Sequence, residues 1–126
     1  MKKEFIPYEQ ALELKELGFN EQCMKGYTEE YKTLISFSST HTNTSVEKTL
    51  PTKPLTAPLY QQAFRWFREK GYRPNIICDS ENINSYYFDV WNVNQFEYET
   101  DYIYNSYEEA ELECLKKLIE IVRNAK

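Results

Sequence analysis

Apolar residues recur with the period of an α-helix through the middle of the chain, in PLYQQAFRWFREKGYRP at positions 58–74. Placing residues about 100° apart around a helix axis gathers the apolar side chains on one stripe and most polar ones opposite. Gly71 and Pro74 are typical of a helix end, and Thr56 and Pro58 of a helix start. The pattern predicts a central helix whose aromatic side is buried and whose basic side faces water. The predicted buried stripe comprises Tyr60, Ala63, Phe64 and Phe67, widened by Leu59 and Trp66.

Two further segments carry the same period. Residues 7–17 are followed by Gly18 and Phe19, which repeats the helix-end pattern of the central segment. Residues 106–124 begin with a serine, and Glu109 three positions later completes the sequence of a capping box. Both segments are predicted to be helices. The apolar arc of the second covers about half of its circumference, which suits packing on a sheet or against a partner.

β-Branched and aromatic residues dominate the stretch that follows the central helix. Residues 85–93, SYYFDVWNV, are the clearest predicted strand and carry aromatic side chains on both faces. Residues 96–104 alternate polar and apolar side chains, as a half-buried strand does, and this alternation places Phe96 and Tyr98 on one face. Residues 76–79 form a third, shorter predicted strand. The three are predicted to pair as one antiparallel sheet.

The pattern is weaker ahead of the central helix. Residues 24–28 and 33–37 are predicted as two short strands joined by a turn. Residues 38–54 are rich in Ser and Thr and contain two prolines near their end, which is typical of a loop. Seventeen residues without secondary structure are long for a compact domain. The segment is therefore either mobile or contains an unrecognised hairpin tip.

Together these elements predict a single α+β domain over residues 1–126, with an antiparallel sheet of three or more strands and two or three helices mainly on one face. The chain is long enough to bury a core without disulfides or metals. Its three widely spaced cysteines fit a reducing cytoplasm better than a disulfide framework. The N-terminus lacks the apolar segment of a signal peptide, and no apolar run approaches the ~20 residues of a membrane span. We therefore predict a cytoplasmic protein with no membrane association.

Charge is segregated along the chain, although the net charge is only −5 at pH 7. Residues 76–113 hold ten acids and no Lys or Arg, whereas residues 53–73 hold five cations and one acid. Three of the acids follow one side of the predicted strand at 96–104, where like charges repel unless they are solvated or met by cations. The alternatives are pairing with the central helix, a basic protein partner or bound cation, and mimicry of nucleic-acid phosphates. The three acids are Glu97, Glu99 and Asp101.

The basic side of the central helix is the other candidate binding surface. In the simplest interpretation its cations are solvated and their aliphatic stems cover apolar surface. The alternative is a contact to an anion or a nucleic acid, in which Trp66 or Tyr72 stacks on a base. That alternative requires an exposed aromatic side chain beside the cations. The candidate residues are Arg65, Trp66, Arg68, Lys70 and Arg73.

The chain shows few of the residue patterns that catalysis requires. Its one histidine, His41, falls in the predicted Ser/Thr-rich loop, which is poor preorganisation for a Ser-His-Asp or Cys-His site. Neither a metal-ligand spacing nor a glycine-rich phosphate loop is present. We predict no catalytic residues, no metal site and no cofactor.

Three stretches resemble a known group of proteins: YEQALELKELGF at 8–19, PLYQQAFRWFREK at 58–70 and SYEEAELECLKKLIEIV at 106–122. They cover 42 of the 126 residues, all in predicted helices. They resemble small uncharacterised proteins of gut anaerobic bacteria and of their phages and mobile elements. The resemblance implies a bacterial or phage accessory protein of the cytoplasm, and it carries over no activity and no functional residue.

The leading functional hypothesis is a non-enzymatic interaction protein that binds a protein partner or a second copy of itself. It rests on the wide apolar arc of the last helix, on the aromatic residues on both faces of residues 85–93, and on the missing catalytic patterns. The alternative is a nucleic-acid-associated protein that uses the basic and aromatic residues of the central helix. An enzyme that uses strand carboxylates, with or without a metal ion, is the third hypothesis.

Overall fold

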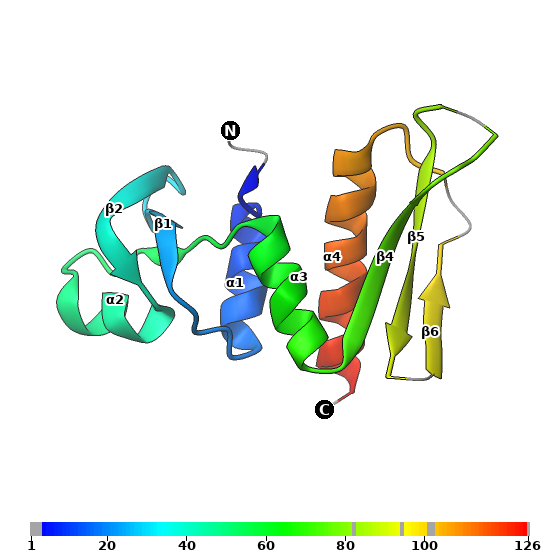
Figure 1. Ribbon diagram of the computed structural model, residues 1–126. Coiled ribbons are helices and arrows are strands. Elements are labelled where there is room, and N and C mark those ends of the chain that lie inside the picture. The colour runs from blue at the N-terminus through cyan, green and yellow to red at the C-terminus, as the bar shows by residue number, and fades with distance from the viewer. Residues whose placement is uncertain (1–3, 82, 94, 101–102, 126) are drawn as a thin grey trace. The chain divides into compact units, whose positions relative to one another are not determined.

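A computed structural model describes residues 4–81, 83–93, 95–100 and 103–125. Within these ranges the chain forms four α-helices and two three-stranded antiparallel sheets, which confirms the predicted α+β class (Figure 1). Contacts along the chain divide it into two compact units, Met1–Tyr60 and Gln61–Lys126. Each unit contains one of the sheets. The expectation of a single domain over residues 1–126 stays a prediction.

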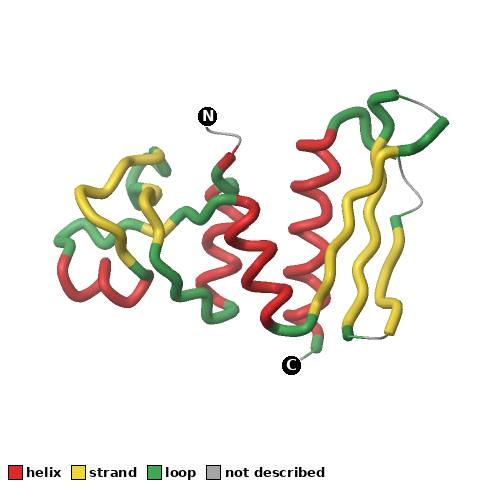
Figure 2. Tube along the Cα trace, viewed as in Figure 1, coloured by secondary structure: helices red, strands yellow, loops and turns green. Residues whose placement is uncertain are grey.

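The first unit contains a sheet with the strand order β2-β1-β3 and two helices (Figures 1 and 2). The prediction of two short strands near residues 24–28 and 33–37 is confirmed by β1 and β2. Both β2 and β3 pair with β1 in the antiparallel sense. In chain order the elements are α1 (Tyr8–Glu16), β1 (Cys23–Tyr27), β2 (Leu34–His41), α2 (Asn43–Thr49) and β3 (Leu55–Thr56).

Helix α1 ends as its sequence predicts. Gly18 has a φ of +100°, which only glycine adopts without strain, and the Phe19 amide donates to the Leu14 carbonyl at 2.9 Å. Gln10, Ala11 and Leu14 are buried. The Schellman-type turn therefore brings Phe19 back toward Leu14, on the buried side of α1.

The prediction of a Ser/Thr-rich loop over residues 38–54 is wrong as to secondary structure. Strand β2 continues to His41, and α2 occupies Asn43–Thr49. The helix begins with a reciprocal capping box in which the Thr42 side chain accepts from the Ser45 amide, and Ser45 Oγ accepts from the Thr42 amide. A helix of two turns is too short for an apolar period, and Ser replaces the usual Glu or Gln of the box. Sequence reasoning therefore missed it.

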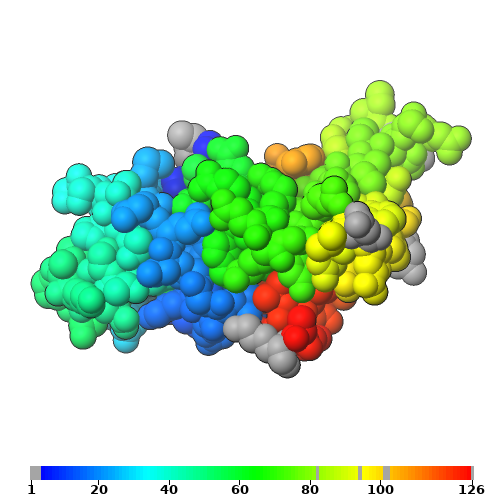
Figure 3. All heavy atoms as spheres, turned by 60° about the horizontal axis from the view of Figure 1, so that its bottom comes forward, coloured from blue at the N-terminus to red at the C-terminus, as the bar shows by residue number. Residues whose placement is uncertain are grey.

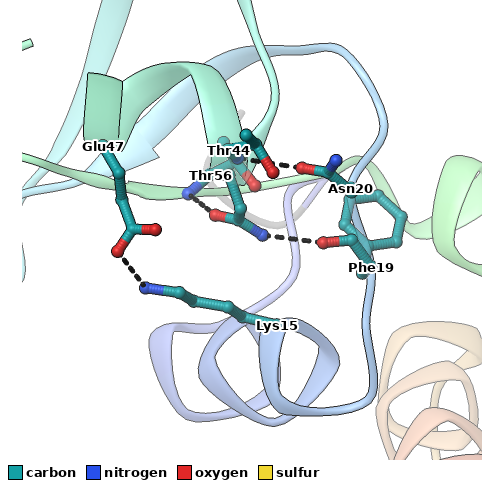
Figure 4. A network of polar contacts seen from close by, with 7 residues as sticks. Lys15, Phe19, Asn20, Thr44, Glu47 and Thr56 are labelled. Carbon is teal, nitrogen blue, oxygen red and sulfur yellow. Dashed lines mark hydrogen bonds and ion pairs between the residues drawn. The ribbon is translucent and has the colours of Figure 1, made fainter. Parts of the chain in front are cut away.

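Asn43 connects α2 to the rest of the first unit through bonds to Phe19 and Thr56, both of which are labelled in Figure 4. Its side-chain Nδ2 donates to the Phe19 carbonyl at 3.0 Å, and its Oδ1 accepts from the Thr56 amide at 3.1 Å. Beside it, the Thr44 amide donates to Asn20 Oδ1 at 2.9 Å. Asn43 itself is buried, so its two bonds satisfy backbone groups where water is excluded. Helix α2 is thus held by polar contacts as well as by the buried side chain of Val46.

The central helix, α3, spans Tyr60–Glu69. The predicted start is wrong, because Thr56 pairs within β3 and is not an N-cap, and Pro58 precedes the helix. The predicted stop is confirmed, since Gly71 has a φ of +99° and its amide donates to the Arg68 carbonyl at 3.0 Å. The predicted sidedness is confirmed too. The buried residues of α3 are Tyr60, Ala63, Phe64, Trp66 and Phe67.

The second unit contains a sheet with the strand order β4-β5-β6, in which both pairs are antiparallel. The strands are β4 (Tyr72–Cys78), β5 (Tyr86–Asn92) and β6 (Gln95–Glu99). All three predicted strands are confirmed, but β4 begins earlier than predicted and β6 ends earlier. Beyond β6, Tyr104 forms an isolated bridge with Tyr86.

Helix α4 (Tyr107–Asn124) covers one face of this sheet by packing on β4 and β5. The predicted start is confirmed, because Ser106 Oγ accepts from the Glu109 amide at 3.1 Å. The ring of Tyr107 lies edge-on to Tyr86, and Lys117 Nζ lies 4.2 Å from the ring centroid of Tyr98. The buried residues of α4 are Ala110, Cys114, Leu115, Leu118, Ile119 and Val122.

Candidate binding site

The two faces of the β4-β5-β6 sheet carry different side chains. Side chains alternate along a strand, so Phe88 and Val90, which are buried, point to the side that α4 covers. Their neighbours on β5 point to the other side, together with their partners on β4 and β6. We call this second side the open face. It comprises Arg73, Asn75 and Ile77 on β4, Tyr87, Asp89 and Trp91 on β5, and Phe96 and Glu99 on β6.

A β-bulge brings two aromatic rings together on the open face. Val90 pairs with Tyr98, but the next residue, Trp91, pairs with Phe96, so Glu97 is an extra residue in β6. The prediction that Phe96 and Tyr98 share a face is therefore wrong. Phe96 lies beside Trp91, with the ring centroids 5.4 Å apart and the planes at 79°.

Both of these rings are exposed, Trp91 to 38% and Phe96 to 47%. In Figure 3 the atoms of this part of the chain, coloured yellow, lie at the surface of the second unit. We call Trp91 and Phe96 the ring pair. Exposed aromatic residues in edge-to-face contact are unusual on a surface that only water covers, since each ring could bury a large apolar area.

The turn beside the ring pair is conformationally strained. Val93 has a φ of +56°, a region that β-branched residues rarely enter and that costs about 1–3 kcal/mol. Two contacts hold it there: its amide donates to the Gly71 carbonyl at 2.9 Å, and Arg73 Nη2 donates to its carbonyl. Arg73 is thus directed along the edge of the open face toward the turn. Strain of this kind is concentrated at functional sites.

Two carboxylates occupy the next row of the open face. Asp89 on β5 and Glu99 on β6 are direct cross-strand partners, so their side chains leave the sheet about 5 Å apart. We call them the acid pair. Asp89 Oδ1 accepts from Asn75 Nδ2 at 2.8 Å. Among the cations that the structure describes, none forms an ion pair with either acid, so no direct salt bridge offsets the repulsion between them.

The predicted basic site on α3 is divided by burial. Arg65, Arg68 and Lys70 are exposed, but Trp66 is only 8% exposed. Lys70 Nζ lies 4.4 Å from the Trp66 ring centroid, a cation–π contact within the chain. Trp66 is therefore not placed to stack on a base, and Tyr72, half-buried on β4, is the other residue that the nucleic-acid interpretation names. The fifth predicted residue, Arg73, lies on β4 and belongs to the open face.

The predicted acidic face is also divided. Glu99 belongs to the acid pair, Glu97 is the bulge residue, and Asp101 lies outside the described residues. Glu97 and Glu99 form no ion pair with any cation of the described chain, so the predicted pairing with the central helix is wrong for these two. Sequence reasoning did not name Trp91, Phe96 or Asp89 as site residues. The signal was present in residues 85–93, whose second face also carries aromatic and acidic side chains.

His41 and Cys114 both lie in structural surroundings. His41 lies on β2, where its Nδ1 is 3.0 Å from Ser45 Oγ, one of the two hydroxyls of the capping box of α2. Burial raises the pKa of the Cys114 thiol, which keeps it protonated and unreactive in the core of the second unit. Within the described ranges no three His, Cys, Asp or Glu residues are grouped as a metal site would need.

Glu111 is the carboxyl group whose protonation the fold shifts into the neutral range. Its burial on α4 raises its pKa from 4.5 to about 7, and the nearby Glu108 carboxylate contributes to the rise. Below pH 4.5 the group is neutral in both the folded and the unfolded chain. As the pH rises toward 7 the unfolded chain releases its proton first, so the stability that the neutral group contributes is lost through about pH 7.

We expect the variant Glu111→Gln to be more stable than the wild type at pH 8, by about 1 kcal/mol once solvent screening of a half-exposed group is allowed for. At pH 5 the two proteins should have nearly equal stability. Thermal unfolding between pH 5 and pH 8 measures the difference. Glu113→Gln, a neutralisation on the same helix where the carboxylate pairs with Lys116, is the charge-matched control, and it should retain the loss of stability that Glu111 causes between pH 5 and pH 8. An identical pH dependence in Glu111→Gln and the wild type would contradict this assignment.

Comparison of the chain with protein-family models, with curated proteins and with solved structures finds no match. None of the helices in the described part of the chain is long and apolar enough to cross a membrane. The suggested relation to accessory proteins of bacteria and phages stays a prediction. The function is therefore inferred from the residues of the open face.

Proposed function

We propose that the protein is a non-enzymatic binding protein that docks a protein partner on the open face of its second sheet. The observation that carries this proposal is the ring pair, two aromatic side chains exposed in contact with each other on a sheet face opposite α4. Trp and Arg are the residue types most enriched among the energetically dominant residues of protein interfaces. Trp91 and Arg73 are cross-strand partners on this face, and Phe96 extends it.

The sheet itself supports docking on this side. Seven consecutive residue pairs join β4 to β5, and α4 packs against both strands from the opposite face. The side chains of the open face therefore stand on a backbone that is fixed before a partner arrives. A preorganised surface loses less conformational entropy on binding than a mobile loop does.

Selection from a library of random peptides tests the proposal without assuming the partner. Peptides selected on the immobilised wild-type protein should bind the double variant Trp91→Ser/Phe96→Ser at least tenfold more weakly, because truncating a dominant interface residue typically costs 2 kcal/mol or more. Tyr31→Ser is the matched control, since Tyr31 is 78% exposed and belongs to the first unit, whereas the open face belongs to the second. Its affinities should equal those of the wild type. Selected peptides that bind the double variant as tightly as the wild type would refute the proposal.

The nucleic-acid hypothesis is the second candidate, and the exposure of Arg65, Arg68 and Lys70 on α3 is the observation in its favour. The burial of Trp66 removes one of the two predicted stacking residues and leaves Tyr72, which is half-buried on β4. Binding of a single-stranded oligonucleotide that weakens steeply with added salt would favour this candidate over the first. The absence of a gel shift at low salt would remove it. An enzyme that uses strand carboxylates stays the third hypothesis.

A further inference from the structure

The open face carries an electrostatic imbalance beside its ring pair. The acid pair places two carboxylates opposite each other, and like charges in this position destabilise a sheet. The surrounding sequence adds to the effect, because residues 76–113 contain ten acids and no Lys or Arg. The acid pair therefore opposes folding of the free chain. A cation that does not belong to the described chain would neutralise the two carboxylates and account for their placement.

The ring pair offers the second half of a cation site. The ring faces of Trp and Phe carry negative electrostatic potential and attract a cation within about 6 Å of the ring centroid. Trp91 follows Asp89 by two residues on the same side of β5, so the acid pair and the ring pair occupy adjacent rows of one face. Rings and carboxylates together favour an alkylammonium or guanidinium group on a long side chain over a small hydrated ion.

The one cation of the open face is turned away from this place. Arg73 Nη2 donates to the carbonyl of Val93, which follows Trp91 on the side away from Asp89. Its charge is thus directed to the β5–β6 turn, and the row of the acid pair is left to Asn75, a neutral neighbour. Arg73 stands beside Trp91 in the row of the ring pair, one row from the acid pair, and its guanidinium group is engaged by the Val93 carbonyl.

We infer that the open face receives an arginine or lysine side chain of a basic partner protein, held between the ring pair and the acid pair. The inference rests on the proposed function and adds the chemistry of the partner to it. The positive charge lies over the rings and against the carboxylates, and the partner backbone runs across the strands. Charge complementarity also steers a basic partner toward this acidic half of the chain.

A nona-arginine peptide is the probe that tests the inference on the full chain. The protein contains two tryptophans, so its NMR spectrum has two indole N–H signals, and a Trp91→Phe variant assigns them. Addition of the peptide should shift the Trp91 signal. The double variant Asp89→Asn/Glu99→Gln should weaken binding about tenfold, since it removes two charge contacts beside the rings, one half-buried and one exposed. This variant should fold at least as well as the wild type, because it removes a like-charge repulsion.

The matched control is Glu29→Gln/Glu30→Gln, which changes the net charge by the same amount at two adjacent exposed acids of the first unit. It should change the dissociation constant less than twofold. Equal weakening by both double variants would overturn the inference, because it would show a delocalised attraction. A Trp91 signal that moves with a single-stranded oligonucleotide and not with nona-arginine would overturn it as well. Selected peptides that lose affinity for the Trp91→Ser/Phe96→Ser variant but contain no Arg or Lys would contradict this inference. They would still support the proposed function.

Discussion

Replacing Phe88 by alanine is expected to lower the free energy of unfolding by about 4 kcal/mol. Phe88 is buried between β5 and α4, and its ring centroid lies 6.1 Å from that of Tyr104 and 5.8 Å from that of Tyr98. Truncation removes this apolar contact and leaves a cavity that the sheet and the helix cannot fill completely. Urea denaturation measures the loss, with the fluorescence of Trp66 and Trp91 as the signal, since both lie in the second unit.

Phe96→Ala is the matched control for Phe88→Ala, because it deletes the same atoms from the neighbouring strand. Phe96 is 47% exposed, so its loss should cost less than about 1 kcal/mol. The same variant should weaken the binding of selected peptides. A loss of stability as large as that of Phe88→Ala would contradict the assignment of Phe96 to the open face.

Replacing Asn43 by alanine is expected to destabilise the first unit by about 3 kcal/mol. The side chain donates to the Phe19 carbonyl and accepts from the Thr56 amide, and all three residues are buried. The variant removes both bonds at once, and a buried backbone group that loses its partner costs about 1–3 kcal/mol. Far-UV circular dichroism during urea denaturation measures the change. Hydrogen exchange at the Thr56 amide should accelerate in the same variant.

Thr44→Ala tests whether this effect belongs to the buried amide and not to α2 in general. Thr44 is exposed, and its contact to Asn20 is made by its backbone amide, which alanine retains. We expect a change of at most about 0.5 kcal/mol. If Asn43→Ala were as mild as Thr44→Ala, the network in Figure 4 would not hold α2 in place.

Helix ends and helix faces could be predicted from the sequence because local interactions decide them. Gly18 and Gly71 both adopt the left-handed conformation that the helix-end pattern requires. Phe64 and Phe67 are buried because the helical period of apolar residues places them on the side of α3 that must face the core, whichever element covers it. Ser106 caps α4 by a bond to a residue three positions away. No information about distant segments is needed for any of these features.

The features that were missed depend on residues far apart in the chain. Helix α2 is stabilised by the Asn43 bonds to Phe19 and Thr56, which are 24 and 13 positions away. The face of Phe96 depends on a bulge in its pairing with β5, and alternation along β6 alone gives the opposite answer. Neither contact is encoded in a short window of sequence.

The candidate site shows the same division. The sequence alone indicates its residue types: Arg73 and Glu99 are among the candidate binding residues, and residues 85–93 carry aromatic side chains on both faces. The sequence predicts that Trp66 lies on the buried stripe of the central helix, but it could not show that Trp91 is exposed, because both faces of residues 85–93 carry aromatic side chains. Burial depends on what packs against a surface, and that is a property of the folded chain.

By itself the sequence determined the α+β class, the sides of the helices and the segregation of charge, since these depend on composition and on residues within a few positions of one another. The tertiary structure alone decided which aromatic residues reach the surface and which acids face each other. The register of β5 against β6, shifted by the extra residue Glu97, places Phe96 beside Trp91 and Asp89 opposite Glu99. Strand register depends on burial and on pairing between segments that are distant in the sequence. The residues of the open face are therefore known only from the folded sheet.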